Sequence, residues 1–227
     1  MPEGTGLKGE IEMRKLKTLA LAVVAVAALM ATVGAGSAAA TETALCKAPT
    51  TFAGLPRCEP NHLWPANTRI HSEQEVGTKL VMPLPNGVVE CNKSTLEAFT
   101  EKATSKPLGA NVTALTFGEC QDAGEPVDVE TIKKGTLDIE IIDLPEWTHN
   151  GTLTLTGTEI RVKWTITGDE CFYDPGDIGT LTGGAMATID WAGPLTWTAG
   201  NLGCIPGNGS WNGFHTVTSP EPLWVSM

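Results

Sequence analysis

Apolar residues occupy every second position of residues 158–166, TEIRVKWTI, and this period of two constrains the fold more than any other feature. Ile160, Val162 and Trp164 share one side of the segment, and charged residues share the other. A half-buried strand of an antiparallel sheet has this pattern. The same alternation is found in residues 111–117, 135–144 and 151–158. Turns rich in Gly, Pro and Asn-Gly separate these segments, so the sequence predicts an all-β fold, an antiparallel β-sandwich or barrel of about 8–11 short strands.

One segment departs from the period of two. In residues 93–104, KSTLEAFTEKAT, Leu96 and Phe99 are spaced as on one face of a helix. Ser94 or Thr95 stands where a helix N-cap would be needed. The pattern favours a short helix, or a single helical turn, at this point of the chain.

Residues 1–40 have the layout of a secretory signal peptide. Basic residues within 14–17 precede an apolar run rich in Ala, Val and Leu, and small residues then lead to an A-x-A-like site ending at Ala40. An N-terminal membrane anchor is the alternative, but the apolar run is short for a span. Three acids precede Met13 where a positive start is expected, so Met13 is a candidate initiator. Residues 41–227 then form a single domain, with no membrane span after removal of the signal peptide.

All six cysteines lie after the expected cleavage site. An even number of cysteines in an exported chain predicts disulfide bonds, and six cysteines allow fifteen pairings. We expect sequential pairing, so that each bridge closes a modest loop between nearby strands: Cys46–Cys58, Cys91–Cys120 and Cys171–Cys204. No C-x-x-C motif is present and the four histidines are scattered, which argues against a structural zinc site.

The charge balance is acidic. The chain has 15 basic and 26 acidic residues, a net charge of −11, and residues 41–227 keep 11 and 23 of them, a net charge of −12. Such a protein has no electrostatic reason to bind nucleic acid or an anionic membrane surface. We therefore expect no nucleic-acid partner.

Motifs for nucleophilic or metal-dependent catalysis are missing from the sequence. It contains neither G-x-S-x-G nor H-E-x-x-H, and paired cysteines leave no thiolate nucleophile. Two carboxylates brought together by the fold would still allow a hydrolase. Asp138 and Glu140 share one face of a predicted strand, about 7 Å apart, although the solvent face of a strand also has this pattern. We expect no catalytic residue, no cofactor and no enzymatic activity.

Four carboxylates crowd the segment TGDECFYDPGDIG, residues 167–179. The spacing of a helix–loop–helix calcium site fails from either possible starting aspartate. Asp174 and Asp177 remain candidates for an irregular calcium site completed by backbone carbonyls. The Pro-Gly pair between them is also good turn chemistry and explains the composition without a ligand.

Seven tryptophans stand against one tyrosine. Trp191, Trp197 and Trp211 lie near turns or in polar strands, where exposed indoles could stack on sugar rings. The alternative, which the general behaviour of large aromatic residues favours, is that they fill the core.

Short motifs built on the cysteines and their strands resemble those of a family of uncharacterised secreted bacterial proteins, Thr- and Gly-rich, cysteine-containing and all-β. The matching stretches are LCK at 45–47, LWPANTRI at 63–70, VVECNKSTL at 88–96, LTFGEC at 115–120, CFY at 171–173 and VTSPEPLWVS at 217–226. The resemblance implies export and an all-β fold, and it implies no activity, ligand or cofactor. This chain departs from the family pattern in having more acidic residues and more tryptophans.

Taken together, the sequence predicts a secreted or envelope-associated, non-catalytic β protein with a structural or binding role. A polysaccharide or a cell-surface component would be its partner. The alternatives are a carbohydrate-binding module that uses exposed tryptophans, and a hydrolase whose carboxylates meet only in the folded chain.

Overall fold

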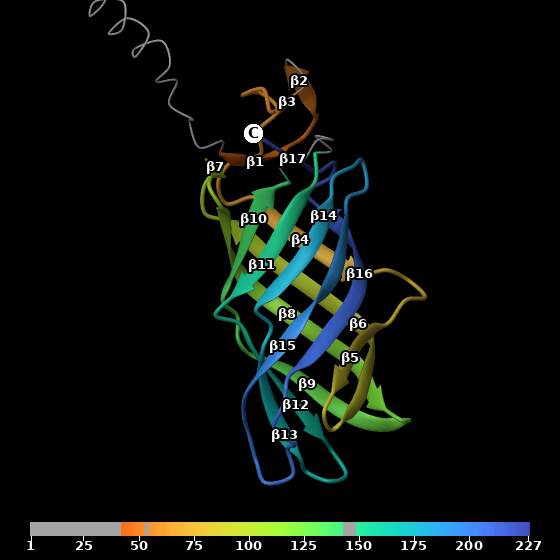
Figure 1. The fold of residues 1–227 in the computed structure, drawn as a ribbon. Helices are drawn as coiled ribbons and strands as arrows, with labels where there is room; N and C mark the ends of the chain where they lie inside the picture. The colour runs from red at the N-terminus through yellow and green to blue at the C-terminus, as the bar shows by residue number, and fades with distance from the viewer. Residues whose placement is uncertain (1–41, 53–54, 143–148) are drawn as a thin grey trace, which may run out of the picture. The chain divides into compact units, whose positions relative to one another are not determined.

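The computed structural model describes residues 42–52, 55–142 and 149–227, which contain seventeen strands and no helix (Figure 1). These residues belong to the compact unit Glu42–Met227, and the signal peptide expected at 1–40 lies outside the described residues. The strands are β1 Thr43–Cys46, β2 Thr50–Phe52, β3 Leu55–Arg57, β4 Arg69–Gln74, β5 Leu80–Leu84, β6 Gly87–Thr100, β7 Thr104–Ser105, β8 Leu108–Asp122, β9 Glu125–Lys133, β10 Thr136–Ile141, β11 Gly151–Thr156, β12 Glu159–Trp164, β13 Glu170–Asp174, β14 Asp177–Thr182, β15 Thr188–Gly200, β16 Gly209–Ser219 and β17 Trp224–Ser226. The predicted all-β class is confirmed.

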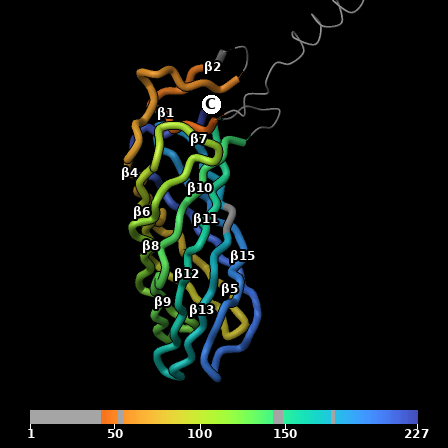
Figure 2. The backbone as a smooth tube through the Cα atoms, turned by 90° about the vertical axis from the view of Figure 1, so that its left-hand side faces the viewer, coloured from red at the N-terminus to blue at the C-terminus, as the bar shows by residue number. Residues whose placement is uncertain are grey.

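Twelve of the strands form one antiparallel sheet that closes on itself. One ring runs β8-β10-β11-β14-β15-β16-β4-β6 and returns to β8. A second ring runs β8-β9-β12-β13-β15-β16-β5-β6 and also returns to β8. The long strands β6, β8, β15 and β16 pass through both rings, which explains the elongated barrel seen in Figures 1 and 2. Closure leaves few free strand edges, the usual liability of a large sheet.

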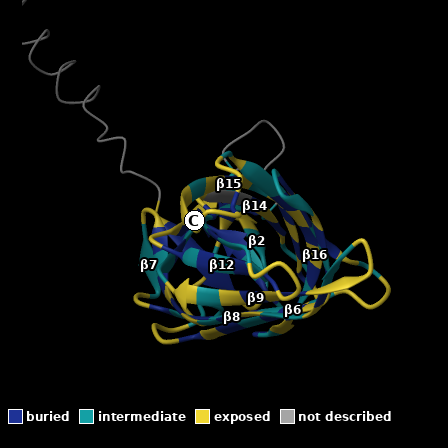
Figure 3. Cartoon of the chain, turned by 90° about the horizontal axis from the view of Figure 1, so that it is seen from below, coloured by how far each residue is buried: buried dark blue, intermediate teal, exposed yellow. Residues whose placement is uncertain are grey.

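Alternation in the sequence becomes alternation of burial in the barrel wall. In β12, Ile160, Val162 and Trp164 are buried, and the charged residues between them face outward. The same inside–outside pattern marks most of the wall when the barrel is viewed along its axis (Figure 3). The seventeen strands outnumber the 8–11 expected: twelve form the barrel, and the other five, β1, β2, β3, β7 and β17, have only two to four residues.

A β-bulge interrupts the alternation expected in residues 111–117. The register between β6 and β8 shifts beside Thr113, so that Val112 pairs with Ala98 but Ala114 pairs with Glu97. Val112 and Leu115, three positions apart, are therefore both buried. The extra residue of a bulge changes which side of the sheet the following residues face.

The helix expected over residues 93–104 is wrong. Residues up to Thr100 continue β6, which pairs with β4 on one side and β8 on the other. Leu96, Ala98 and Thr100 are buried at a period of two, so Leu96 and Phe99 do not share a face. Pairing with two neighbouring strands outweighs the weak helical preference of this segment.

Two tryptophans, Trp191 and Trp211, are buried next to each other in the core. The indoles of Trp191 and Trp211 are 2% and 1% exposed, and their ring centroids lie 5.7 Å apart. Gly179 makes room for Trp191, because a Cβ at that glycine would stand 3.0 Å from the indole Cε3. The barrel interior is thus a packed core in which large side chains face small ones.

One end of the barrel carries a small cap. The sheet β17-β1-β7 lies there, with Leu45 of β1 paired to Val225 of β17, and the Cys46–Cys58 bridge ties the following loop to it. The opposite end is formed by the turns that join β5 to β6, β8 to β9 and β12 to β13, and by the loop from β15 to β16 (Figure 2). We call it the turn end.

Three disulfides form with the expected sequential pairing, Cys46–Cys58, Cys91–Cys120 and Cys171–Cys204. No cysteine among the described residues is free. The second bridge joins directly paired positions of β6 and β8, and the third joins the start of β13 to the β15–β16 loop. Three bridges are consistent with an oxidising compartment.

A polar network crosses the core at His215. Its Nε2 lies 2.6 Å from the hydroxyl of Ser94, its Nδ1 lies 3.1 Å from that of Ser72, and Ser94 donates to Gln74 Oε1 at 3.0 Å. Gln74 in turn donates to the carbonyls of Thr78 and Cys91. A neutral imidazole protonated on Nε2 satisfies every member. Burial lowers the pKa of His215 to about 4 and keeps Ser94 out of reach of any substrate.

Acid should therefore weaken the fold before most carboxylates titrate. The unfolded chain protonates His215 near pH 6.5 and the folded chain only near pH 4, so the unfolded state binds more protons between these values. Stability falls as pH falls through this window, by about 2 kcal/mol between pH 7.5 and pH 5. Urea unfolding at both pH values measures the loss. Burial lowers the pKa of His149 in the same direction, so a comparison with His215→Gln isolates the contribution of His215; an unchanged loss in that variant would contradict the assignment.

Candidate ligand-binding site

A cleft of about 390 Å³ opens at the turn end. Three segments far apart in sequence line it: the β5–β6 turn, the junction of β8 and β9, and the segment from the end of β12 to the start of β13. The lining residues are Asn86, Asp122, Ala123, Glu125, Pro126, Trp164, Thr165, Ile166, Thr167 and Asp169. The size lies within the range of small-ligand sites. Loops at the end of a rigid barrel are also where binding residues are commonly placed.

Trp164 supplies the apolar wall of the cleft. It is the last residue of β12 and is 9% exposed. Its Nε1 donates to Asp122 Oδ2 at 2.9 Å, and the other oxygen of Asp122 accepts from the backbone N–H of Val88 at 3.3 Å. Asp122 thus fixes the indole and joins three turns at one point.

The charge in the cleft is entirely negative. Asp122, Glu125 and Asp169 line it, and none of the described Lys, Arg or His residues does. Within the described part of the chain, neither Glu125 nor Asp169 has an ion pair or a side-chain hydrogen bond. Acids on the barrel wall differ, because many face a cation: Arg69–Glu97, Lys79–Glu90, Lys93–Glu119, Lys133–Glu159, Arg161–Glu130 and Lys163–Glu170. Carboxylates without a partner around an apolar wall create a field that attracts a cation.

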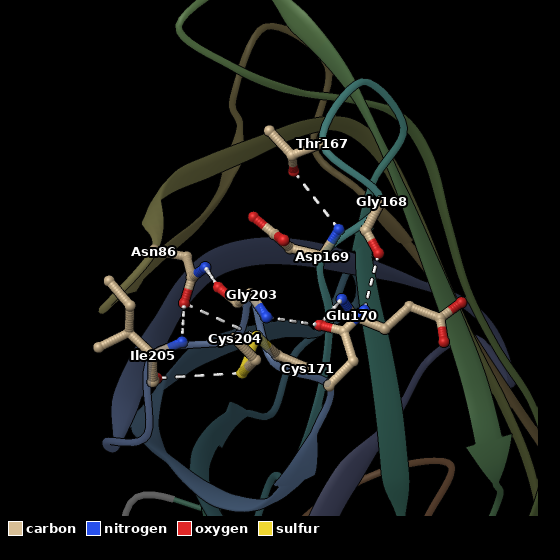
Figure 4. Close-up of a disulfide and its surroundings, with 10 residues drawn as sticks. Asn86, Thr167, Gly168, Asp169, Glu170, Cys171, Gly203, Cys204 and Ile205 are labelled. Atoms are coloured by element: carbon tan, nitrogen blue, oxygen red, sulfur yellow. Dashed lines mark hydrogen bonds between the residues drawn. A yellow bond between two sulfur atoms is a disulfide. The ribbon is translucent and has the colours of Figure 1, made fainter.

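Asn86 fastens the β15–β16 loop beside the cleft. Its Nδ2 donates to Gly203 O at 2.9 Å, and its Oδ1 accepts from the N–H of Ile205 at 2.7 Å. Figure 4 shows Asn86 at this loop, next to the Cys171–Cys204 bridge. Leu202 and Ile205, both exposed, lie in the loop that these contacts hold beside Asn86.

The carboxylate of Asp169 packs against the same loop. A Cβ at Gly203 would overlap its Oδ1, so only glycine leaves space for the side chain there. Asn201 holds the loop from the other side: Nδ2 donates to Gly168 O at 2.8 Å, and Oδ1 accepts from the N–H of Glu170 at 3.2 Å. Asp169 is therefore set in place by its surroundings: its backbone carbonyl accepts from the N–H of Trp164 at 3.0 Å, while its carboxylate oxygens have no donor among the described residues.

Replacing Asn86 with alanine should loosen this end of the molecule. Two hydrogen bonds to the loop are lost, and we expect the free energy of unfolding to fall by about 1–3 kcal/mol in denaturant titration. Amide exchange should rise at residues 201–205 and stay low in the β15–β16 ladder. The control is Asn212→Ala on the exposed face of β16, which should change stability by less than about 0.5 kcal/mol. Equal effects of the two variants would contradict the assigned role.

The calcium candidates Asp174 and Asp177 do not form a described site. Asp174 ends β13, and its Oδ1 is buried without a hydrogen-bond partner. The side chain of Asp177 lies outside the described residues. No group of three or more metal-ligating side chains occurs among the residues that the structure describes.

The tryptophans proposed as a sugar platform need correction. Trp191 and Trp211 are buried in the core and offer no face to a ligand. Trp197 is partly buried against the same core, with its Nε1 buried and without a hydrogen-bond partner. Gly179 on the neighbouring strand β14 leaves space for the indole of Trp191, as expected of a close-packed core.

Asp138 and Glu140 lie on the outer face of β10, next to Thr152 and Thr154 of the paired strand β11. With Pro107 they line a hollow of about 210 Å³ that has no apolar wall comparable to Trp164. The sequence placed these two acids on one strand face, and the structure agrees.

Sequence reasoning missed most of the cleft. Asp169 stood out in the acidic segment, but Asn86, Asp122 and Glu125 looked like ordinary turn residues in LPNG and QDAGE. Only the closure of the barrel brings their three turns together.

Comparison with known proteins adds no relative: no family model, no curated protein and no solved structure matches the chain. In the part of the chain that the structure describes, no helix is long and apolar enough to cross a membrane.

Proposed function

We propose that the protein is an exported, non-catalytic binding protein and that the cleft at the turn end is its ligand site. One observation carries this proposal: a cleft of about 390 Å³ in which a fixed indole forms the wall, while two of the three carboxylates, those of Glu125 and Asp169, have no side-chain partner among the described residues. Unpartnered polar groups around an apolar surface are the usual composition of a binding site.

Export rests on the disulfides together with the N-terminal pattern. Three bridges suit an oxidising compartment, and a signal peptide would deliver the chain there. The resemblance to secreted all-β bacterial proteins points the same way. Action outside the cell or at the envelope follows as part of the proposal.

A binding role, in preference to a catalytic one, is supported by the environment of the reactive side chains. The serine–histidine pair Ser94–His215 is buried in the core, and the described cysteines are oxidised. In the cleft, Asp122 is already occupied by two donors and serves to position Trp164.

Protein-observed NMR with a panel of probes tests the proposal: neutral oligosaccharides, basic peptides and acidic peptides. At least one class should give saturable shifts that map to amides of residues 86–88, 122–126 and 164–169. Saturable shifts that map only elsewhere, absence of any binding, or conversion of a probe into product would each overturn it. Glu140→Gln, on the other half of the barrel, should leave the titration unchanged.

A further inference from the structure

We propose that the cleft receives an arginine side chain of a partner polypeptide, whose apolar neighbours rest on the exposed residues around the mouth. This inference rests on the proposed binding function and names the chemistry of the partner. Two independent features carry it: the uncompensated charge inside the cleft and the apolar rim outside it.

The carboxylates that line the cleft favour a positively charged ligand. Asp122, Glu125 and Asp169 line the cleft with no basic residue among its walls. The whole exported chain is acidic as well, so approach of a basic partner is favoured at long range. A neutral or anionic ligand would leave the carboxylates of Glu125 and Asp169 desolvated without compensation.

The distribution of acceptors favours a guanidinium over a smaller cation. Carboxylates enter from two different segments, Glu125 at the start of β9 and Asp169 before β13, and Thr167 also lines the cleft. A planar guanidinium presents five N–H donors in a fixed fork and can serve several carboxylates at once. A lysine ammonium would act only as a point charge.

Exposed apolar residues at this end of the barrel favour a partner with apolar residues next to its arginine. Ile166, in the β12–β13 turn, lines the cleft and is 68% exposed. Leu202 is fully exposed and Ile205 is 54% exposed, and both lie in the loop that Asn86 fastens beside the cleft. Large apolar side chains gathered at one end of an acidic protein are typical of a contact surface. The combination of acids inside and apolar residues around them suits a polypeptide with an arginine between aliphatic residues.

Calorimetry with a matched pair of peptides tests the proposal. The probe is acetyl-Leu-Arg-Leu-amide, and its control replaces arginine with citrulline, which keeps the shape and removes the charge. We expect the arginine peptide to bind at least tenfold more tightly, and its affinity to fall as salt rises from 50 to 200 mM. Equal affinity of the two peptides would overturn the proposal.

Variants of the protein locate the contact. Glu125→Gln and Asp169→Asn should each lower the affinity for the arginine peptide at least fivefold. Glu140→Gln, with the same change in net charge, should leave this affinity unchanged. Ile166→Ser should lower the affinity for the peptide at least threefold. Val76 is exposed in the β4–β5 loop, and Val76→Ser should leave the affinity unchanged. Equal losses in the cleft variants and their controls would overturn the assignment.

The outcomes separate this inference from the broader proposal. Binding of a neutral oligosaccharide in the cleft, with no preference for arginine, would overturn the arginine proposal and leave the binding function standing. A concentration-dependent dimer that protects the cleft would assign it to a second copy of the chain and would also overturn it. Lack of binding by every class of probe would remove both proposals.

Discussion

Replacing Trp191 with alanine should lower the free energy of unfolding by about 3–5 kcal/mol, the usual effect of deleting a buried aromatic side chain. The indole is 2% exposed and contacts Trp211 and His215 of the neighbouring strand β16, with ring centroids 5.7 and 6.1 Å away. Its neighbour Gly179 has no side chain that could fill the space left behind. The cavity would therefore persist, and the cost would lie toward the upper part of this range.

Equilibrium unfolding in guanidinium chloride measures the loss. The control is Phe214→Ala: Phe214 lies on β16 but is 49% exposed, and its truncation should cost less than about 1 kcal/mol. The loss in the free energy of unfolding for Trp191→Phe should lie between those for Trp191→Ala and Phe214→Ala. A loss below 1 kcal/mol for Trp191→Ala would contradict the placement of this residue in the core.

Removal of the Cys171–Cys204 bridge should have the second largest effect. The bridge spans 33 positions, and the loss of that constraint on the unfolded chain predicts a decrease of about 4 kcal/mol. The double variant Cys171→Ala/Cys204→Ala leaves no free thiol from this pair. Its melting temperature should fall by roughly 10 °C for a chain of this size.

The Cys46–Cys58 bridge provides the comparison. It spans 12 positions, so the same reasoning predicts about 3 kcal/mol for Cys46→Ala/Cys58→Ala. Only the first variant should also raise amide exchange in residues 201–205, because Cys204 lies in that loop. An unchanged melting temperature in the Cys171→Ala/Cys204→Ala variant would show that the bridge does not constrain the fold.

Local patterns in the sequence were sufficient for several of the strands, including β11 and β12, and for the bridges. The period of two in β12 and β11 reports directly which side chains enter the core, because alternate residues of a strand face opposite sides. The disulfides followed from the assumption that each closes a short loop, and all three pairs form as expected.

Long-range pairing decided the cases in which local patterns failed. Residues 93–100 resemble a helix when read alone, but they lie between β4 and β8 and complete both ladders. The burial of Trp191 and Trp211 likewise depends on the closed barrel, because strand pattern alone does not show how far a sheet is covered.

The cleft could not be predicted from the sequence, because it too depends on pairing between strands that are distant in the chain. Asn86, Asp122 and Asp169 are separated by dozens of residues, and each has a sufficient local explanation as a turn residue. What distinguishes them is a property of the folded chain: the two turn carboxylates and the amide meet around Trp164 with no cation nearby.

Fluorine NMR of the protein labelled with 5-fluorotryptophan tests the assigned site most directly. Each of the seven tryptophans gives its own resonance, which Trp→Phe variants assign, and of the tryptophans that the structure describes only Trp164 lines the cleft. Titration with acetyl-Leu-Arg-Leu-amide should shift the Trp164 resonance saturably and leave those of Trp191 and Trp211 in place. A Trp164 resonance that stays unmoved with this peptide and with every other probe of the panel, or shifts confined to Trp197 and Trp224, would contradict the assignment of the cleft as the ligand site.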